Sequence, residues 1–435
     1  MRPFRPLLLV LALLAAPAVH AQVTVIRAGH VVDVAAGRAV ANQSILVRDG
    51  VIEAVGPNLA VPAGAEVIDL SGSYVLPGLI DAHTHVGVTE LPGAKNNDYG
   101  SYYIGSLIED TAYRAVQGTM QARAYLEAGF TWIRDTGNNG SYGDVAVKRA
   151  IEGGWIPGPN MSVAGIMIAP YGGQFQMQPE KPDLGNPEYT YADTQDEIRL
   201  AVRKNIHFGA TTIKLIVDNQ PYYYSVDDVR AAVEEAGAVG VKVMAHATTD
   251  EGMRNAILGG VASIEHGFQP SDETLKLMVE HGTYLVGTDF PKSFSERRYP
   301  ASLERNRRAF AAGVKMAFGS DVVYYREGWT KGELVLEFTD TYKDSGFPND
   351  HILRMMTVNA ADLIGVKAGE VKAGYEGSLI AVAGNPLDDI TALRQVSFVM
   401  KDGVVYKQNG EFRFDLPRTL DNPYRKPQRG NLFRR

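Results

Sequence analysis

Short apolar runs rich in β-branched residues, separated by Gly, Asn and Asp, fill the chain between residues 23 and 76. These runs fall at residues 23–26, 31–34, 44–47 and 51–55. No helical period connects them, so the pattern predicts a small β-domain. The same pattern returns at residues 378–382 and 396–407. We therefore expect a composite β-domain, a small β-sandwich built from residues 22–76 and 370–415, which encloses the segment 77–369.

Within the enclosed segment, short β-rich runs alternate with longer stretches of helical period, such as residues 195–207 and 226–238. The second of these helices begins with Ser225 followed by Asp228, a capping box. Such alternation is typical of βα units and a parallel sheet, and eight candidate strands match an α/β fold of the (β/α)8 TIM barrel type. The strands are expected at residues 79–82, 131–134, 162–165, 211–216, 241–246, 263–265, 283–286 and 314–319.

The two ends of the chain differ from the segments between them. Arg2 and Arg5 precede an apolar run at residues 7–16, and small residues lead to Ala21. This pattern predicts a cleavable signal peptide over residues 1–21, with cleavage after Ala21, and thus a periplasmic or secreted protein. A membrane anchor is the alternative, but the run is shorter than the roughly 20 residues that span a bilayer. Residues 416–435 are expected to form a basic C-terminal tail.

Composition narrows the possible chemistry. The chain has no cysteine, which excludes disulfides, thiolate metal ligands and a cysteine nucleophile. Any metal must then be bound by nitrogen and oxygen ligands. The net charge of −7 argues against a nucleic-acid partner, because neutralising phosphates requires a basic surface.

Four histidines and one acid fall at the carboxyl ends of the predicted strands, where a barrel builds its active site: His83, His85, His246, His266 and Asp321. His83 and His85 are separated by one residue on an extended segment, so they point to the same side and can bind one metal together. A single histidine at a strand end is usually structural. The whole set, however, favours a metal site.

Lys214 lies inside an apolar run expected to be buried in the sheet. It either points outward or forms a buried ion pair, or it lies deprotonated at the barrel mouth, where it is modified or binds metal. Asp321 follows two small residues, Gly319 and Ser320. It is either a helix N-cap or a metal ligand that also takes a proton from the attacking water.

Together, the segment 77–85 with its sequence Pro-Gly-Leu-Ile-Asp-Ala-His-Thr-His, Lys214, His246, His266 and the triplet at 319–321 resemble the amidohydrolase superfamily. More narrowly, the chain resembles the imidazolonepropionase-like group, which includes Xaa-Pro and Xaa-Arg/Lys dipeptidases and ochratoxin amidohydrolases. The resemblance covers nearly the whole chain after residue 21, including the late segments 357–361 and 384–387.

The resemblance implies two divalent metal ions, with zinc as the default. His83, His85 and Asp321 would bind the first ion, His246 and His266 the second, and a carbamate on Lys214 would bridge them. It implies hydrolysis of the amide bond of a dipeptide or N-acyl amino acid by a metal-bridging hydroxide, with Asp321 as the catalytic proton carrier.

The resemblance also suggests substrate-binding residues. Relatives that cleave dipeptides use a tyrosine and an arginine after the fourth strand to bind a free carboxylate, and Tyr224 and Arg230 match that placement. Arg230 is otherwise an ordinary solvated residue on an amphipathic helix. Gln174 stands where relatives often have a histidine facing the substrate carbonyl, and it donates a hydrogen bond but cannot change its charge.

Two alternatives stay open at this point. One is a hydrolase of the same superfamily that acts on a cyclic amide or lactone. The other is a non-catalytic periplasmic protein that binds its ligand without turning it over. In either case we expect a small-molecule substrate or ligand, no membrane span and a homo-oligomer.

Overall fold

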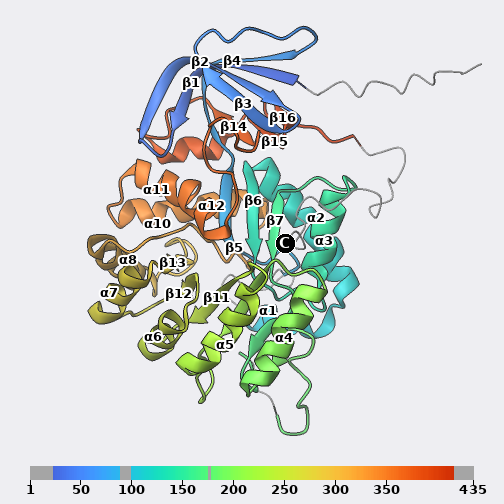
Figure 1. Cartoon of the computed structure of the whole chain (residues 1–435), viewed down its shortest axis with the longest axis vertical. Coiled ribbons are helices and arrows are strands. Elements are labelled where there is room, and N and C mark those ends of the chain that lie inside the picture. Colours follow the sequence, from blue (N-terminus) through green and yellow to red (C-terminus); the bar gives the residue numbers. More distant parts are fainter. Residues whose placement is uncertain (1–22, 89–98, 175–177, 416–435) are drawn as a thin grey trace, which may run out of the picture.

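The computed structural model describes residues 23–88, 99–174 and 178–415 (Figure 1). The predicted signal peptide at 1–21 and the predicted tail at 416–435 lie outside the described residues. None of the helices in these ranges is both long enough and apolar enough to cross a membrane.

A barrel of parallel strands forms the larger part of the molecule. Its strands pair in parallel within two hydrogen-bonded groups, β5-β6-β7 and β13-β12-β11-β10-β8-β9. They are β5 (Leu79–Thr84), β6 (Phe130–Asp135), β7 (Asn160–Val163), β8 (Met167–Ala169), β9 (Tyr189–Tyr191), β10 (Thr212–Ile216), β11 (Lys242–Ala247), β12 (Ser263–His266) and β13 (Tyr284–Val286). Seven of the eight predicted strands are present, and β8 and β9 are additional short strands that the sequence did not indicate.

The eighth predicted strand, at 314–319, closes the barrel without forming a regular strand. It makes one ladder bridge, from Met316 to Leu285 of β13. On its other side, the Ala82 N–H of β5 donates to the Phe318 carbonyl at 2.8 Å. The close approach to β5 requires a glycine next, because a Cβ on Gly319 would lie 2.8 Å from the Cβ of His83.

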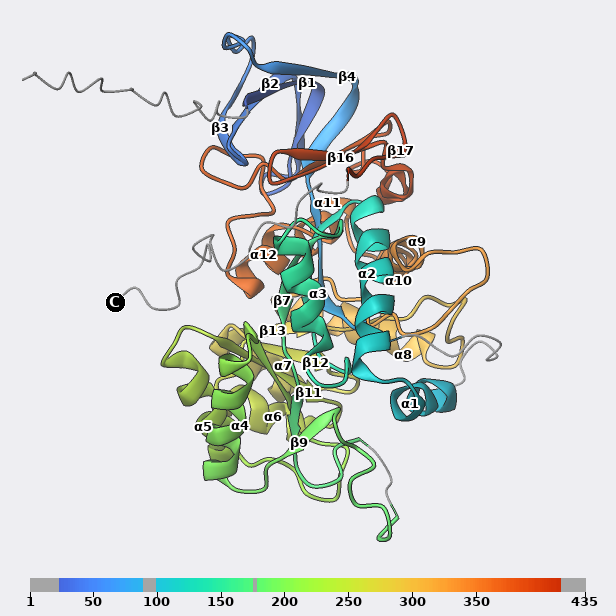
Figure 2. The same ribbon diagram turned by 90° about the vertical axis from the view of Figure 1, so that its right-hand side faces the viewer.

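Helices cover the outside of the barrel (Figures 1 and 2). They are α1 (Tyr99–Ile108), α2 (Thr111–Glu127), α3 (Gly143–Glu152), α4 (Gln195–His207), α5 (Val226–Gly237), α6 (Asp250–Gly259), α7 (Asp272–His281), α8 (Tyr299–Ala312), α9 (Lys331–Leu336), α10 (Phe338–Asp344), α11 (Asn349–Met355) and α12 (Val358–Ile364). The predicted capping box is present, because the Ser225 side chain accepts from the Asp228 N–H and the Asp228 side chain accepts from the Ser225 N–H.

Strands from both ends of the chain form one mixed sheet, ordered β17-β16-β15-β14-β4-β1-β2-β3. They are β1 (Val23–Asp33), β2 (Arg38–Arg48), β3 (Val51–Gly56), β4 (Glu66–Pro77), β14 (Leu379–Val382), β15 (Phe398–Lys401), β16 (Val404–Gln408) and β17 (Glu411–Phe412). One buried core contains Ile26 of β1, Ile45 of β2 and Phe398 of β15. The predicted sandwich is therefore a single continuous sheet whose two halves pack on each other. The exact domain boundaries stay a prediction.

The mixed sheet lies at the amino ends of the barrel strands. The Gly78 N–H, just before β5, donates to the Ser378 carbonyl at 3.0 Å, and the Trp132 indole of β6 donates to Glu376 at 2.7 Å. In Figures 1 and 2 the sheet therefore occupies the end of the molecule from which β5 runs into the barrel. The carboxyl ends of the strands face away from it and are left to form a site.

Candidate metal centre

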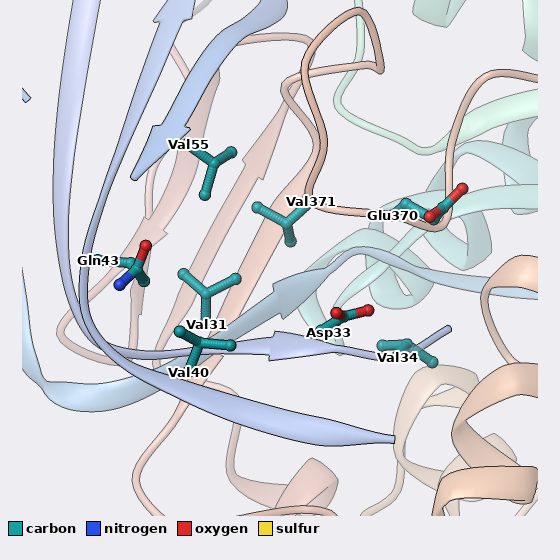
Figure 3. A pocket seen from close by; sticks show the side chains of 8 residues that line it. All are labelled: Val31, Asp33, Val34, Val40, Gln43, Val55, Glu370 and Val371. Atoms are coloured by element: carbon teal, nitrogen blue, oxygen red, sulfur yellow. The ribbon is translucent and has the colours of Figure 1, made fainter. Parts of the chain in front are cut away.

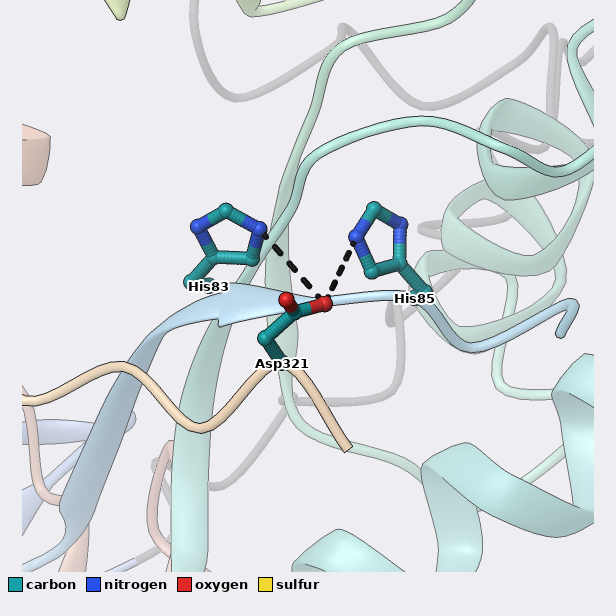
Figure 4. A group of neighbouring side chains, drawn as sticks. All are labelled: His83, His85 and Asp321. Atoms are coloured by element: carbon teal, nitrogen blue, oxygen red, sulfur yellow. Dashed lines mark ion pairs between the residues drawn. The ribbon is translucent and has the colours of Figure 1, made fainter. Parts of the chain in front are cut away.

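Three side chains that are far apart in the sequence meet at the carboxyl ends of the strands. His83 lies in β5, His85 follows that strand, and Asp321 lies just after the irregular eighth segment (Figure 4). His85 Nε2 is 3.2 Å from Asp321 Oδ1, and His83 Nε2 is 3.8 Å from the same oxygen. One potential ligand atom of each residue lies within 4.8 Å of the other two. This spacing suits one divalent metal ion between them.

Hydrogen bonds at the other ring nitrogens orient both imidazoles. His85 Nδ1 lies 2.8 Å from the Gly137 carbonyl oxygen, which only accepts, so Nδ1 carries the proton. His83 Nδ1 donates to the Glu265 carboxylate at 2.6 Å. Both Nε2 atoms therefore lie on the side of Asp321, and that of His85 is also 3.1 Å from the Thr136 hydroxyl. Burial, together with the nearby charge of Lys214, holds the pKa of His83 well below its usual value, so its ring is neutral.

The other two predicted histidines belong to the same cluster. His246 lies in β11 and His266 at the end of β12, with ring centroids 4.5 Å apart. The His266 ring is also 5.1 Å from that of His83. His266 Nδ1 lies 2.8 Å from the hydroxyl of Thr288, which leaves its Nε2 for another partner. Burial lowers the pKa of His246 to about 3, so this ring is neutral as well.

Lys214 lies in β10 and is 2% exposed. Burial lowers the pKa of its amine to about 8, although the carboxylates of Glu265 and Asp321 act in the opposite direction. Its charge in turn lowers the pKa of three of the histidines. The lysine is therefore buried near enough to the histidines to affect their pKa values, and the outward orientation considered from the sequence is wrong.

Glu265 is a buried carboxylate that binds the His83 ring, and sequence reasoning missed it. One of its oxygens accepts from His83, and the other accepts from Arg134 Nη2 at 2.8 Å and from the Ser263 hydroxyl. Arg134 also donates to the Ala82 carbonyl at 2.6 Å. Glu265 and Arg134 were detectable by the signal that identified Lys214, namely a charged residue inside a run expected to be buried.

Asp81 fixes the backbone that carries Asp321. Its carboxylate accepts from the His83 and Ser320 N–H groups, both at 3.0 Å, and from the Ser320 hydroxyl. Burial raises the pKa of Asp81 to about 7, against the effect of these hydrogen bonds. The Asp321 N–H donates to the His83 carbonyl at 2.8 Å, and its φ of +55° is a left-handed conformation that Asp tolerates better than most residues. These contacts aim the Asp321 carboxylate at the histidines.

The arrangement fits a divalent metal. Within the described ranges, the buried Nε2 atoms of His83 and His246 have no hydrogen-bond partner. A buried polar atom without a partner costs about 1–3 kcal/mol, so a cation bound at the His83 lone pair would remove a penalty. The ligand set contains only imidazole nitrogen and carboxylate oxygen, which suits zinc, manganese or cobalt.

The predicted carboxylate-binding pair has protein partners in the structure. Tyr224 is buried, and its hydroxyl donates to the Ala192 carbonyl at 2.7 Å. Arg230 lies on the exposed side of α5 and forms an ion pair with Asp227, one turn away. The role of these two residues stays a prediction, and it requires both side chains to exchange these partners for the substrate.

Gln174 lies in the loop between β8 and β9. Its side-chain oxygen accepts from the Tyr189 hydroxyl at 2.8 Å. The neighbouring Gly173 carbonyl accepts from the Gln220 amide at 2.7 Å, which ties this loop to the one after β10. Because Tyr189 occupies the oxygen, the amide nitrogen is the group that remains for a substrate. The role of Gln174 in substrate binding stays a prediction.

A small cavity of about 140 Å³ lies elsewhere, inside the mixed sheet (Figure 3). It is lined by Val31, Asp33, Val34, Val40, Gln43, Val55, Glu370 and Val371. Its walls are mainly valine, and it contains none of the predicted site residues. The histidine cluster is therefore the stronger functional site.

The fold and the metal-binding group define a metal-dependent hydrolase with a TIM barrel. Residues 74–406 match the amidohydrolase family, and the chain belongs to this family. It is thus a metal-dependent amidohydrolase, an enzyme that acts on carbon–nitrogen bonds.

Individual relatives narrow the comparison. Ochratoxinase from Aspergillus niger is 29% identical over 90% of this chain and 88% of its own length, and its crystal structure superposes with a TM-score of 0.75. The structure of a Xaa-Pro dipeptidase with bound methionine has a TM-score of 0.75 and 28% identity, covering 89% of this chain and 100% of the dipeptidase. Imidazolonepropionase from Deinococcus deserti is 24% identical over 80% of this chain and 87% of its own length. The predicted superfamily and fold are confirmed.

Proposed function

We propose that the protein is an exported binuclear amidohydrolase that cleaves the amide bond of a dipeptide or an N-acyl amino acid. The observation that carries this proposal is the cluster itself. His83, His85 and Asp321 offer three converging ligand atoms, and the His246 and His266 rings continue the cluster from the adjoining strands. Lys214 is buried with both groups. Two ligand groups with an amine among them suit two metal ions and a bridging ligand.

The bridge would be a carbamate on Lys214. A neutral lysine amine adds to carbon dioxide, which forms an N–C bond and releases one proton. The product is an anion with two oxygen ligands, and it replaces a buried cation among histidines. The burial that lowers the pKa of Lys214 also increases the fraction of reactive neutral amine near neutral pH.

The side chains of the protein would divide the remaining work. Bound divalent metal supplies a Lewis acid that lowers the pKa of water and polarises the carbonyl oxygen. Asp321 is 19% exposed at its side chain, so it can take a proton from the attacking water and deliver it to the leaving nitrogen. Gln174, held by Tyr189, would donate its amide N–H to the substrate.

The names of the relatives support an amide with an amino-acid part. One relative is a Xaa-Pro dipeptidase crystallised with methionine, an amino acid with a free carboxylate, and another is an ochratoxinase.

The proposal is tested with purified, metal-loaded protein on dipeptides and N-acyl amino acids, each paired with its C-terminal carboxamide. Release of amine from the free acids, and much less from the carboxamides, is expected. Turnover of cyclic amides or lactones alone would favour the alternative substrate class. Tight binding of the free acids without release of amine would favour a binding protein.

The bridging lysine has its own test. Lys214→Ala is expected to lose hydrolysis and to retain fewer than two metal ions per chain by elemental analysis. A small carboxylic acid such as acetate should restore part of the activity, because it supplies the missing two-oxygen ligand. Full activity of Lys214→Ala without added acid contradicts the proposed bridge.

Export is tested separately, by N-terminal sequencing of the protein recovered from cell fractions. A mature chain that begins at Gln22 in the periplasm or the medium is the expected result. Full-length chain retained in the cytoplasm would contradict export and leave the proposed chemistry untouched.

A further inference from the structure

Lys331, the first residue of α9, is a buried lysine with no role in the site as described so far. It is 4% exposed. Its ammonium group donates to the carbonyl oxygen of His85 at 2.9 Å and also to that of Val88. These partners lie 246 and 243 residues away along the chain. Lys331 therefore connects α9, which follows the eighth barrel segment along the chain, to the turn after β5.

The turn at 85–88 has left the sheet, so side chains hold it in place. The Val86 N–H donates to the Asp135 carboxylate at 2.7 Å, and the Gly87 N–H donates to the Asn139 amide oxygen at 2.5 Å. These two donors of the turn are thus satisfied from the end of β6 and from the loop after it. Two of its carbonyl acceptors are satisfied by Lys331. The Gly87 carbonyl accepts from Arg114 of α2 at 3.2 Å, so without the ammonium group the His85 and Val88 carbonyls lose their side-chain donor while Gly87 keeps its own.

Tight packing fixes the position from which Lys331 reaches the turn. The next residue, Gly332, packs against α2 so closely that a Cβ would lie 2.2 Å from the Ala124 carbonyl oxygen and 2.6 Å from the Ala128 Cβ. The preceding Thr330 forms a capping box with Glu333. The backbone of Lys331 therefore has little freedom to move, and its side chain reaches the turn from a fixed position.

We propose that Lys331 is a positioning residue that sets the metal affinity of the group formed by His83, His85 and Asp321. The inference rests on the proposed function, namely on two bound metal ions of which His85 binds one. The His85 ring is held at Nδ1 by the loop after β6, and its backbone is held by Lys331. Loss of the second contact would shift the Nε2 atom relative to Asp321. Loss of such support around a metal ligand typically lowers affinity by about 10–100-fold.

The decisive variant is Lys331→Met, which keeps the length and burial of the side chain but removes its donors. Metal affinity is measured by competition with a chelator, and bound ions are counted by elemental analysis at limiting metal. We expect one of the two ions to bind about 10–100-fold more weakly. Lys331→Arg, which keeps donors, should lose less.

Lys401 provides a matched control. It is also buried, at 6% exposure, but it lies in β15 at the other end of the barrel, with its Nζ 3.5 Å from Asn160 Oδ1. Lys401→Met removes the same group and is expected to bind both ions as the unaltered protein does. An equal loss of metal affinity in both variants would mean a general effect of removing a buried lysine, and the inference would be wrong.

His85→Ala separates this inference from the proposed function. Full metal binding by His85→Ala would overturn the ligand assignment itself. Loss of an ion in His85→Ala, with unchanged affinity in Lys331→Met, would overturn only the role of Lys331. If Lys331→Met does not fold, Lys331→Gln replaces it, since its shorter side chain cannot reach both carbonyls. Hydrogen exchange of the 85–88 amides in the metal-free variant should then be faster, and unchanged exchange with unchanged affinity would refute the proposal.

Discussion

At the amino ends of the barrel strands, Glu376 is partly buried under the mixed sheet, where its carboxylate accepts from the Trp132 indole at 2.7 Å and the Asn160 amide at 3.5 Å. At the carboxyl ends, His83 and His246 are buried more completely, yet each keeps a ring nitrogen without a hydrogen-bond partner in the described part of the chain. The carboxylate of Glu376 has its hydrogen-bond partners within the protein. The two histidine nitrogens lack partners and can bind a ligand, so we assign a structural role to the amino end and a functional role to the carboxyl end.

The largest effect is expected at the carboxyl end, from Asp321→Asn. The amide retains the shape of the side chain but cannot accept and deliver a proton, and it is a weaker metal ligand. The turnover rate should fall by about 1000-fold or more. Steady-state kinetics at saturating metal measure the loss, with metal content determined in parallel. A decrease of less than tenfold would mean that Asp321 does not carry the proton.

Metal removal provides the next contrast. Because a ligand that binds only the folded state stabilises it, metal at about 100 times its dissociation constant should add roughly 2.7 kcal/mol to the free energy of unfolding. Thermal unfolding with and without chelator measures this difference. Glu376→Gln, at the other end, should show the same metal-dependent shift. No change on chelation would mean that the unpaired histidine nitrogens do not face a bound ion.

Glu265→Gln tests whether the buried network beneath the histidines serves the metal. The variant removes the charge that orients His83 and neutralises Arg134, so metal affinity should fall by about 10–100-fold. Glu235→Gln is the control, because Glu235 pairs with Arg203 between α5 and α4, and neither residue contacts a histidine or the turn at 85–88 through any hydrogen bond described. The control should lower stability only. Loss of metal affinity in both variants would assign the effect to broken ion pairs in general.

The sequence predicted the parts of the molecule that depend on local pattern. Short β-rich runs between helical stretches located seven of the eight strands, and the histidines could be placed because a parallel barrel brings its strand ends together. The segment 314–319 reads as a strand, but its hydrogen bonds are divided between β5 and β13 and form one bridge. The predicted position of this segment in the barrel was therefore correct, but the prediction that it forms a regular strand was wrong.

Other features depend on packing between distant segments, which no local pattern specifies. Lys331 reaches the turn at 85–88 only because Gly332 lets α9 lie against α2. Tyr224 was placed near a substrate carboxylate by its position after the fourth strand, yet its hydroxyl meets the Ala192 carbonyl. Glu265 and Arg134 carried a usable signal, since each is charged within a buried run, and the same reasoning that singled out Lys214 applies to them.

The smallest effect is expected at the amino end, from Glu376→Gln, and it depends on pH. Burial raises the pKa of Glu376 from 4.5 to about 7. Ionisation of this carboxylate therefore lowers the free energy of unfolding. The loss is absent below pH 4.5, grows as the pH rises, and is complete above about pH 7. A glutamine oxygen can still accept from the Trp132 indole but carries no charge. Allowing for partial exposure, the variant should gain about 1 kcal/mol at pH 8 and nothing at pH 4.5.

Thermal unfolding of the variant and the unaltered protein across this pH range measures the difference. Glu234→Gln is the control, because its carboxylate is 58% exposed and should give no gain that grows with pH. Activity at saturating substrate should stay unchanged in both variants, because Glu376 lies at the end of the barrel opposite the histidines. If Glu376→Gln instead lowers turnover or metal affinity, the two ends are coupled, and the division between a structural end and a functional end does not hold.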